Sequence, residues 1–430
     1  MQTLSTSDAD FEARFARIVD DRRESASDVA ADVTAILSAV KARGDEALVE
    51  YTARFDHYDL GTDADWVIAP EACEAAYKAL DGELRDALDL AAARIRAYHA
   101  AQLPEDRDYR DEAGVRLGAI WRPVDAAGLY VPGGRAAYPS SLLMNAIPAK
   151  VAGVSRLAIA TPTPRGETND LVLAAAHVAG VDEIWRVGGA QAVGALAYGT
   201  GRIGAVDVIT GPGNAWVAEA KRQLYGVVGI DMVAGPSEIL VIADSDNDPD
   251  WIAADLLSQA EHDPTSQSIL ITDDAAFAAL VEDSVTLHTA QLSTEAVARE
   301  SWEANGVVIV VEDLMREAPA LADRLAAEHV ELAIAEPEAM LRAIRHAGSV
   351  FLGRMTPEAI GDYVGGPNHV LPTGRRARFS SGLSVLDFMK RTSFLEVNEA
   401  AFAQIGPTAA TLAHAEGLPA HALSVELRRK

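Results

Sequence analysis

Between residues 115 and 355, short apolar segments alternate with amphipathic ones, and this alternation limits the possible folds more than any other feature of the chain. Segments such as SRLAIATPTP, SEILVIAD and GVVIVVED are typical of buried strands, whereas DLVLAAAHVAGV and AWVAEAKRQLYG have the spacing of helices. Strands that alternate with helices favour parallel sheets that are covered by helices on both faces. Two blocks of this kind, near 130–237 and 237–355, therefore predict two α/β units.

Both ends of the chain are expected to be helical. In the first hundred residues, two long segments carry apolar residues three and four positions apart, and the last fifty residues return to that spacing. A chain of 430 residues with 49% hydrophobic residues can bury more than one core. We therefore expect helical elements before and after the two α/β units.

The charge and the single cysteine restrict the partners and the compartment. A formal net charge of −27 argues against nucleic acid, whose phosphates would be repelled, and against an anionic membrane surface. No apolar run approaches the roughly 20 residues of a membrane helix, and the first residues lack the pattern of a signal peptide. Cys73 is the only cysteine, so disulfides within the chain are excluded. These observations predict a cytoplasmic protein without a nucleic-acid or membrane partner.

The segment LLSQAEHDPT contains two side chains that could bind a metal together. Gln259 and His262 are three residues apart, so on a helix they share one face, and Asp263-Pro264 then ends the helix. One interpretation is a solvated last turn in which His262 complements the helix dipole. The other is a chelating pair, and the segment by itself does not separate the two.

Three other segments place an acidic residue near a histidine. Glu328 and His329 are adjacent in AAEHVEL, where we expect the end of a helix. The other two pairs are Asp362 with His369 in a Gly/Pro-rich loop, and Glu416 with His421 near the C-terminus. Taken singly, each histidine is more often a packing or surface residue, and the others in the chain, His99 among them, give no such signal. Gln259 and His262 with an aspartate and another histidine would form a nitrogen and oxygen set suited to Zn²⁺ or a similar divalent metal.

Four glycine-rich turns lie between predicted strands and helices: YVPGGRAAYPSS, RVGGAQAVG, ITGPGNAWV and VAGPSEI. Backbone N–H groups in such turns can hold a phosphate. GPGN has the first two glycines of the dinucleotide fingerprint, but Trp216 stands where the third would be. The turns fit a nucleotide cofactor in a modified arrangement, but tight turns without a ligand are an open alternative, and a phosphorylated sugar substrate would use the same turns.

Several long motifs resemble the histidinol dehydrogenase family. They include GPGNAWVAEAKRQLYGVVGIDMVAGPSEILVIAD, DLLSQAEHDPTSQSILIT, VGGAQAVGALAYGT, GDYVGGPNHVLPTG and SGLSVLDFMKRTS, and the likeness runs in order from about residue 25 to the C-terminus. The resemblance implies a zinc- and NAD-dependent oxidoreductase of the last step of histidine biosynthesis. Such an enzyme oxidises L-histidinol to L-histidine through L-histidinaldehyde and uses two NAD⁺.

The resemblance also implies a role for particular residues. One Zn²⁺ per chain would be held by Gln259, His262, Asp362 and His421, and Glu328 and His329 would be the acid–base pair. Substrate would contact the metal ligands and His329, together with Ser237, His369 and Glu416. NAD would contact Tyr130, Gln191 and Asn214, which all lie in the glycine turns.

The fold implied by the family is a domain-swapped homodimer of α/β class, with two incomplete Rossmann-like domains and small helical N- and C-terminal domains. On this basis we expect an N-terminal helical arm (1–24), a first α/β domain with the metal and acid–base residues (25–129 and 238–381), a second domain with the NAD turns (130–237) and a swapped helical domain (382–430). The sites would be completed by the partner chain.

The cysteine count bears on the mechanism of aldehyde oxidation. Many such reactions proceed through a cysteine thiohemiacetal, but Cys73 lies in a predicted N-terminal helix, so water must attack the aldehyde directly. His329 would take the proton from the alcohol and then from the hydrated aldehyde, and Glu328 would activate the water. Zinc would act mainly as a template for the nitrogens of histidinol. The alternatives are a related zinc- and NAD-dependent dehydrogenase of another small polyol or amino alcohol, and a non-catalytic metal-binding protein.

Overall fold

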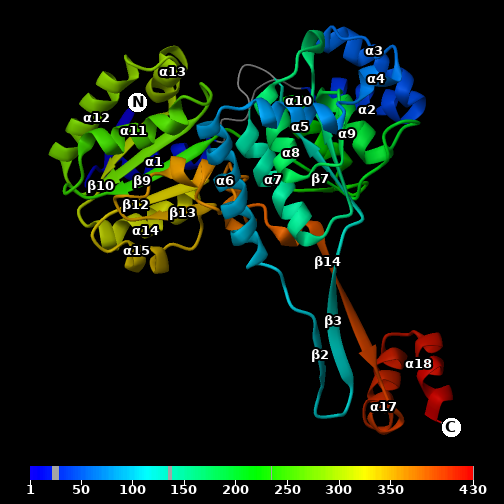
Figure 1. The fold of residues 1–430 in the computed structure, drawn as a ribbon. Helices are drawn as coiled ribbons and strands as arrows, with labels where there is room; N and C mark the ends of the chain where they lie inside the picture. The colour runs from blue at the N-terminus through cyan, green and yellow to red at the C-terminus, as the bar shows by residue number, and fades with distance from the viewer. Residues whose placement is uncertain (22–28, 134–137, 234, 430) are drawn as a thin grey trace.

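The structure is a computed structural model that describes residues 1–21, 29–133, 138–233 and 235–429. It contains two α/β units side by side and a long arm that projects away from them (Figure 1). Among the described helices, none is both long and apolar enough to cross a membrane.

The first unit is built on a six-stranded parallel sheet with the strand order β1-β11-β10-β9-β12-β13. Its strands are β1 (Gln2–Ser5), β9 (Glu238–Ala243), β10 (Gln267–Thr272), β11 (Val307–Val310), β12 (His329–Ala333) and β13 (Ser349–Leu352). One face is covered by α11 (Pro249–Ala260), α12 (Ala275–Thr289) and α13 (Glu295–Asn305). The other face is covered by α1 (Phe11–Asp20), α14 (Leu314–Leu325) and α15 (Pro337–Ala343). Both faces of β9 and β10 are buried, which explains their continuous apolar runs.

The second unit is built on a five-stranded parallel sheet with the order β6-β5-β4-β7-β8. The strands are β4 (Ala126–Tyr130), β5 (Arg156–Ala160), β6 (Glu183–Trp185), β7 (Val208–Thr210) and β8 (Gly229–Ile230). One face packs against α5 (Pro70–Ala79), α6 (Gly82–Ala100), α7 (Pro139–Ala152) and α8 (Asp170–Ala179). The other packs against α2 (Ala30–Arg43), α3 (Asp45–Asp56), α9 (Gly189–Tyr198) and α10 (Ala215–Leu224). Two parallel sheets with helices on both faces confirm the predicted α/β class.

The arm is a three-stranded antiparallel sheet with two helices at its end. Its strands are β2 (Arg107–Arg110), β3 (Arg116–Pro123) and β14 (Met389–Glu396), in the order β14-β3-β2. The chain continues into α17 (Glu399–Ala415) and α18 (Pro419–Glu426), which lie at the tip of the arm, far from both units (Figure 1).

The structure differs from the expected domain assignment at both ends of the chain. Residues 1–21 do not form a separate helical arm. Strand β1 pairs with β11 and becomes the edge strand of the first sheet, and α1 packs on that sheet. Helices α2, α3, α5 and α6 pack on the second sheet, although the expected assignment put 25–129 in the first unit. Their buried residues complete the cores on the two faces of this sheet, together with those of α7 to α10.

The C-terminal segment 382–430 is also not entirely helical. Residues 389–396 form β14, which pairs along its whole length with β3. The strand was not expected because it is exposed on both faces, so MKRTSFLE has no apolar alternation to reveal it. The pairing partner, and not the local pattern, makes this segment extended.

The arm generates a prediction about Gly118, which sits in β3 between Asp108 of β2 and Phe394 of β14. A Cβ at this position would overlap with the Phe394 ring and the Arg107 carbonyl oxygen. We expect Gly118→Ala to lower the free energy of unfolding by about 1–3 kcal/mol, as overpacking does. Urea denaturation followed by circular dichroism measures this loss.

Gly82→Ala is the matched control, since an added Cβ at Gly82 meets nothing within 4 Å. Its effect should stay within about 0.5 kcal/mol. Equal stability of the two variants would contradict the tight packing of the arm at Gly118.

Candidate active site

Glu328 and His329 stand at the start of a strand and not at the end of a helix. Helix α14 ends at Leu325, and Ala326 adopts a left-handed conformation with φ of 47°, which stops the helix. The Glu328 carbonyl then accepts a hydrogen bond from the Ser349 N–H, and His329 begins β12. The expected helix end is therefore wrong. The run HVELA is buried on both faces between β9 and β13, and this placement decides its conformation.

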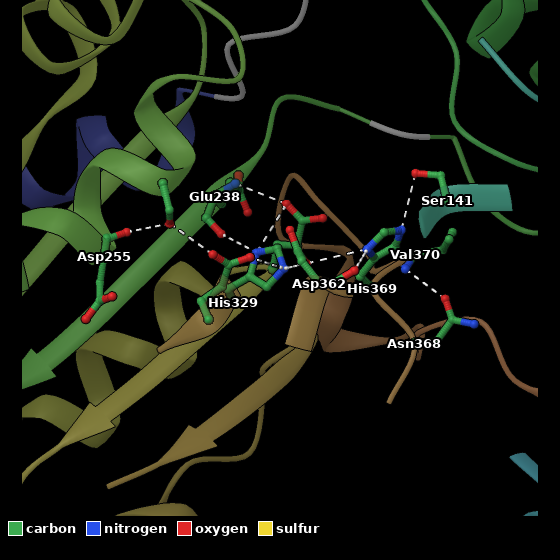
Figure 2. A network of polar contacts seen from close by, with 11 residues as sticks. Ser141, Glu238, Asp255, His329, Asp362, Asn368, His369 and Val370 are labelled. Atoms are coloured by element: carbon green, nitrogen blue, oxygen red, sulfur yellow. Dashed lines mark hydrogen bonds and ion pairs between the residues drawn. The ribbon is translucent and has the colours of Figure 1, made fainter. Parts of the chain in front are cut away.

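The His329 imidazole has a fixed orientation. Its Nδ1 lies 3.1 Å from the carbonyl oxygen of Glu238, which can only accept, so Nδ1 carries the hydrogen in the neutral ring. The free nitrogen, Nε2, faces the carboxylates of Glu358 at 3.6 Å and Asp362 at 3.7 Å. Figure 2 shows the ring between Glu238 and Asp362. A neutral His329 therefore presents an acceptor nitrogen to the Asp362 side of the site.

Glu328 lies beside His329 and is also held by the backbone of β9. Its Oε2 accepts a hydrogen bond from the Glu238 N–H at 3.1 Å and lies 3.7 Å from His329 Nδ1. Residue Glu238 thus contacts both members of the pair through its own peptide groups. The parallel register that sets His329 opposite Ile239 places them there.

Burial and crowding shift the pKa values of this cluster. Burial raises the pKa of Glu328 to about 8, against the attraction of His329, and raises the pKa of Glu358 to about 7. Burial alone would lower the pKa of His329, but the carboxylates of Glu328, Glu358 and Asp362 outweigh it and raise the value to about 10. For Asp362, burial is outweighed by the two histidines, which lower its pKa to about 2. The cluster thus has more carboxyl groups than imidazoles, and its His329, Glu358 and Asp362 side chains lie close enough together to hold a metal ion.

His369 joins the two α/β units at the site. Its Nδ1 lies 2.9 Å from the Asp362 carbonyl oxygen and 3.6 Å from the Asp362 carboxylate. Its Nε2 lies 3.3 Å from the Ser141 hydroxyl, which belongs to α7 of the second unit. Figure 2 shows His369 between Asp362 and Ser141. The candidate site therefore lies where the first unit meets α7.

The loop that carries His369 is anchored by a buried asparagine. The Asn368 side chain donates to the Met144 carbonyl at 2.6 Å, accepts from the Val370 N–H at 2.9 Å and lies 3.3 Å from His99 Nε2. His99 is fully buried, and its Nδ1 lies 2.8 Å from the Ile95 carbonyl oxygen. Nothing in the sequence around His99 marks this role, because it depends on a residue that is 269 positions away.

Gln259 and His262 lie at the end of α11, close to the same cluster. The Ser258 hydroxyl donates to Glu358 Oε2 at 2.9 Å, so the last turn of α11 is beside α16 (Glu358–Tyr363). Gln259 is buried, and neither of its amide atoms has a hydrogen-bond partner among the described residues. His262 is exposed in the turn after the helix, and its charge contributes to the lowering of the pKa of His369, whose main cause is burial.

The remaining implied ligand, His421, is not brought to this cluster. Both His421 and Glu416 are exposed and lie in or beside the helices at the tip of the arm (Figure 1). Within the described residues, the side chains that could hold a metal together are His329, Glu358 and Asp362, whose ligand atoms lie within 4.8 Å of one another. Only Asp362 belongs to both this group and the implied ligand set. Glu358 was missed because nothing in its local sequence marks it.

The three residues with an implied NAD role lie in the second unit. Tyr130 ends β4, and its buried hydroxyl accepts a hydrogen bond from the Gly189 N–H at 3.1 Å. Gln191 is buried in the first turn of α9. Asn214 caps α10 by accepting from the N–H groups of Trp216 and Val217. Ser237, which precedes β9, is half-buried at the start of the first sheet.

The comparisons with known proteins agree with one another. The sequence model of the histidinol dehydrogenase family matches residues 19–429. Histidinol dehydrogenase of Zymomonas mobilis is 63% identical over 422 residues, which are 98% of each chain, and that of Rhodospirillum rubrum is 60% identical over 99% of this chain and 98% of its own. The crystal structure of histidinol dehydrogenase from Elizabethkingia anophelis superposes with a TM-score of 0.94 at 36% identity, covering 100% of this chain and 98% of that one.

The anchoring of the His369 loop can be tested with Asn368→Ala. The substitution leaves the half-buried Val370 N–H and the Met144 carbonyl without this partner, so we expect a loss of about 1–3 kcal/mol in the free energy of unfolding. Hydrogen exchange at the Val370 amide should accelerate at the same time. Urea denaturation and exchange followed by mass spectrometry measure the two effects.

Asn169→Ala is the control, because Asn169 caps α8 and its loss should cost about 1 kcal/mol without touching this loop. Unchanged exchange at Val370 in Asn368→Ala would contradict the anchoring role.

Proposed function

The chain belongs to the histidinol dehydrogenase family and is an oxidoreductase of histidine biosynthesis, and from this premise we propose the reaction and its residues. It oxidises L-histidinol to L-histidine through L-histidinaldehyde and transfers two hydrides to two NAD⁺. The observation that carries the proposal is the buried His329 beside Glu328, with Nδ1 held by the Glu238 carbonyl and Nε2 directed to the Asp362 side of the site.

His329 and Glu328 divide the proton transfers. His329 Nε2 takes the proton of the alcohol and, in the second half, that of the hydrated aldehyde. Glu328 takes a proton from the water that adds to the aldehyde, and burial makes its carboxylate a stronger base than an exposed one, since its pKa is raised to about 8. Cys73 supports direct attack by water, because it packs in the core of the second unit.

We assign one Zn²⁺ per chain to Gln259, His262, Asp362 and His421. The buried Gln259 amide, without a partner among the described residues, fits a ligand role, since an unpaired buried amide is otherwise costly. The nearby excess of carboxylates also fits a cation. When bound, zinc supplies a Lewis acid that holds nitrogen donors of the substrate. Ser237, His369 and Glu416 contact the substrate beside these residues.

The NAD site is assigned to Tyr130, Gln191 and Asn214. All three lie at strand–helix turns of the second unit, where N–H groups at the start of α9 and α10 can hold phosphate oxygens. The second unit meets the first at His369 and Ser141. The cofactor therefore reaches the substrate across the boundary of the two units.

Two chains form a domain-swapped homodimer in which the arm of each completes the site of the other. Glu416 and His421 are exposed at the tip of the arm in one chain, together with large apolar residues that a second chain would cover. These apolar residues include Leu395, Leu412, Leu423 and Leu427.

The first test of the proposal is the yield of NADH from histidinol. Because one site contains both the base and the residue that activates water, we expect two NADH for each L-histidinol consumed and little free aldehyde. Absorbance at the NADH band, with chromatography of the products, gives the ratio. A ratio of one with accumulating aldehyde would contradict the two-step oxidation.

The shared site can be tested by mixing two inactive variants, His421→Ala and His262→Ala, through joint unfolding and refolding. If His421 acts in the partner's site, each mixed dimer has one site with all four ligands. Random mixing then restores about a quarter of the wild-type activity, since half of the dimers are mixed and each has one intact site. Refolding each variant alone is the control. Activity that stays at the level of the separate variants, with mixed dimers demonstrated, would refute the exchange.

A further inference from the structure

A buried ion pair holds one of the glycine turns of the second unit. Lys221 of α10 pairs with Asp231, which follows β8, and their side chains are 4% and 1% exposed. A buried ion pair is rarely a net source of stability, because both charges lose their hydration. The pair therefore matters through the backbone groups that it binds and not through its own contribution to stability.

Both charges of the pair bind the same residue, Gly211. Lys221 Nζ donates to the Gly211 carbonyl at 2.8 Å, and Asp231 Oδ2 accepts from the Gly211 N–H at 2.8 Å. The other carboxylate oxygen of Asp231 accepts from the Met232 N–H at 2.6 Å. The peptide groups on both sides of the Gly211 Cα are thus fixed by side chains from two other elements.

Gly211 adopts a conformation that only glycine takes readily, in close contact with a neighbouring backbone. Its φ is 109°, which side-chain-bearing residues rarely adopt, and a Cβ would overlap with the Tyr130 carbonyl oxygen. Gly211 therefore packs directly on the backbone of Tyr130. The Tyr130 hydroxyl in turn accepts a hydrogen bond from the N–H of Gly189, the first residue of α9. Three residues further on, Asn214 caps α10.

We propose that the Lys221–Asp231 ion pair positions the turn 211–214 and thereby sets the affinity for NAD. The proposal rests on the proposed function, because it takes Tyr130 and Asn214 as cofactor contacts. The pair touches neither the cofactor nor the substrate, so it is a positioning device that acts through Gly211. Its loss lets the turn move relative to Tyr130, while His329 and the proposed zinc ligands, which all lie outside the second unit, keep their places.

The test compares Lys221→Met and Asp231→Asn with the wild-type enzyme and with Lys150→Met. Lys150 is the matched control, because it also pairs with an aspartate in the second unit, Asp182 at 2.6 Å, and that aspartate also accepts from a backbone N–H, that of Leu157. We expect the KM for NAD⁺ to rise at least about tenfold in Lys221→Met, with kcat at saturating NAD⁺ and the KM for histidinol within about twofold of wild type. Asp231→Asn, which can still accept from Gly211, should show a smaller rise. Direct titration with NAD⁺ and hydrogen exchange at the Gly211 and Val217 amides accompany the kinetics.

Each outcome decides the proposal. An unchanged KM for NAD⁺ in a folded variant whose Gly211 amide exchanges faster would overturn it. Equal losses for NAD⁺ and histidinol, or the same change in Lys150→Met, would show a general loss of stability and also overturn it. Failure of both variants to fold, with Lys150→Met folded, would assign the pair a purely structural role. If the wild-type protein does not bind NAD⁺ at all, the proposed function itself fails, and this result is distinct from the others.

Discussion

The candidate site depends on the parallel pairing of β9 with β12. Because His329 is opposite Ile239 in this register, Glu238 directs its carbonyl to the imidazole and its N–H to the Glu328 carboxylate. Backbone groups of a buried strand are among the least mobile atoms in a protein, since each is fixed by its neighbours in the sheet. The orientation and the tautomer of the neutral imidazole thus follow from the fold and need no further side chain to set them.

The boundary between the two units is the second constraint. His369 lies on the loop after α16 but touches Ser141 of α7, and Asn368 beside it binds the Met144 carbonyl of the same helix. Arg94 of α6 adds hydrogen bonds to the carbonyls of Val364 and Gly365. Helices of the second unit therefore determine where a loop of the first unit lies. With NAD on the second unit and the substrate on the first, as proposed above, this arrangement would fix the distance between the two in advance.

The sequence predicted those features that depend on the local pattern of apolar residues or on long family motifs. The strand–helix alternation predicted the two parallel sheets, which the structure confirms, and the motifs predicted the family. The strand β14, the packing of α2, α3, α5 and α6, and the strand conformation of His329 could not be predicted from the local sequence, because partners far along the chain decide them. Glu358 and His99 were missed for the same reason. Their partners are Ser258 and Asn368, which lie 100 and 269 residues away, and nothing beside them in the sequence marks a buried role.

The arm brings the fold and the proposed site together. In this antiparallel sheet of three strands, the two outer strands are exposed on both faces, so the sheet by itself buries little apolar surface and gains little from folding. Its strand β3 nevertheless continues through Val124 into β4 of the second unit, and β14 continues from η3 (Val385–Phe388), whose Phe388 is buried in the core of that unit. The base of the arm is therefore stabilised by its own chain, while its tip, with Glu416, His421 and the exposed leucines, has apolar surface that a partner would cover. In the proposed dimer, the chain that covers the tip of its partner's arm also receives His421 from that arm as the last ligand of its own metal site. Assembly of the dimer and completion of the site are therefore one event.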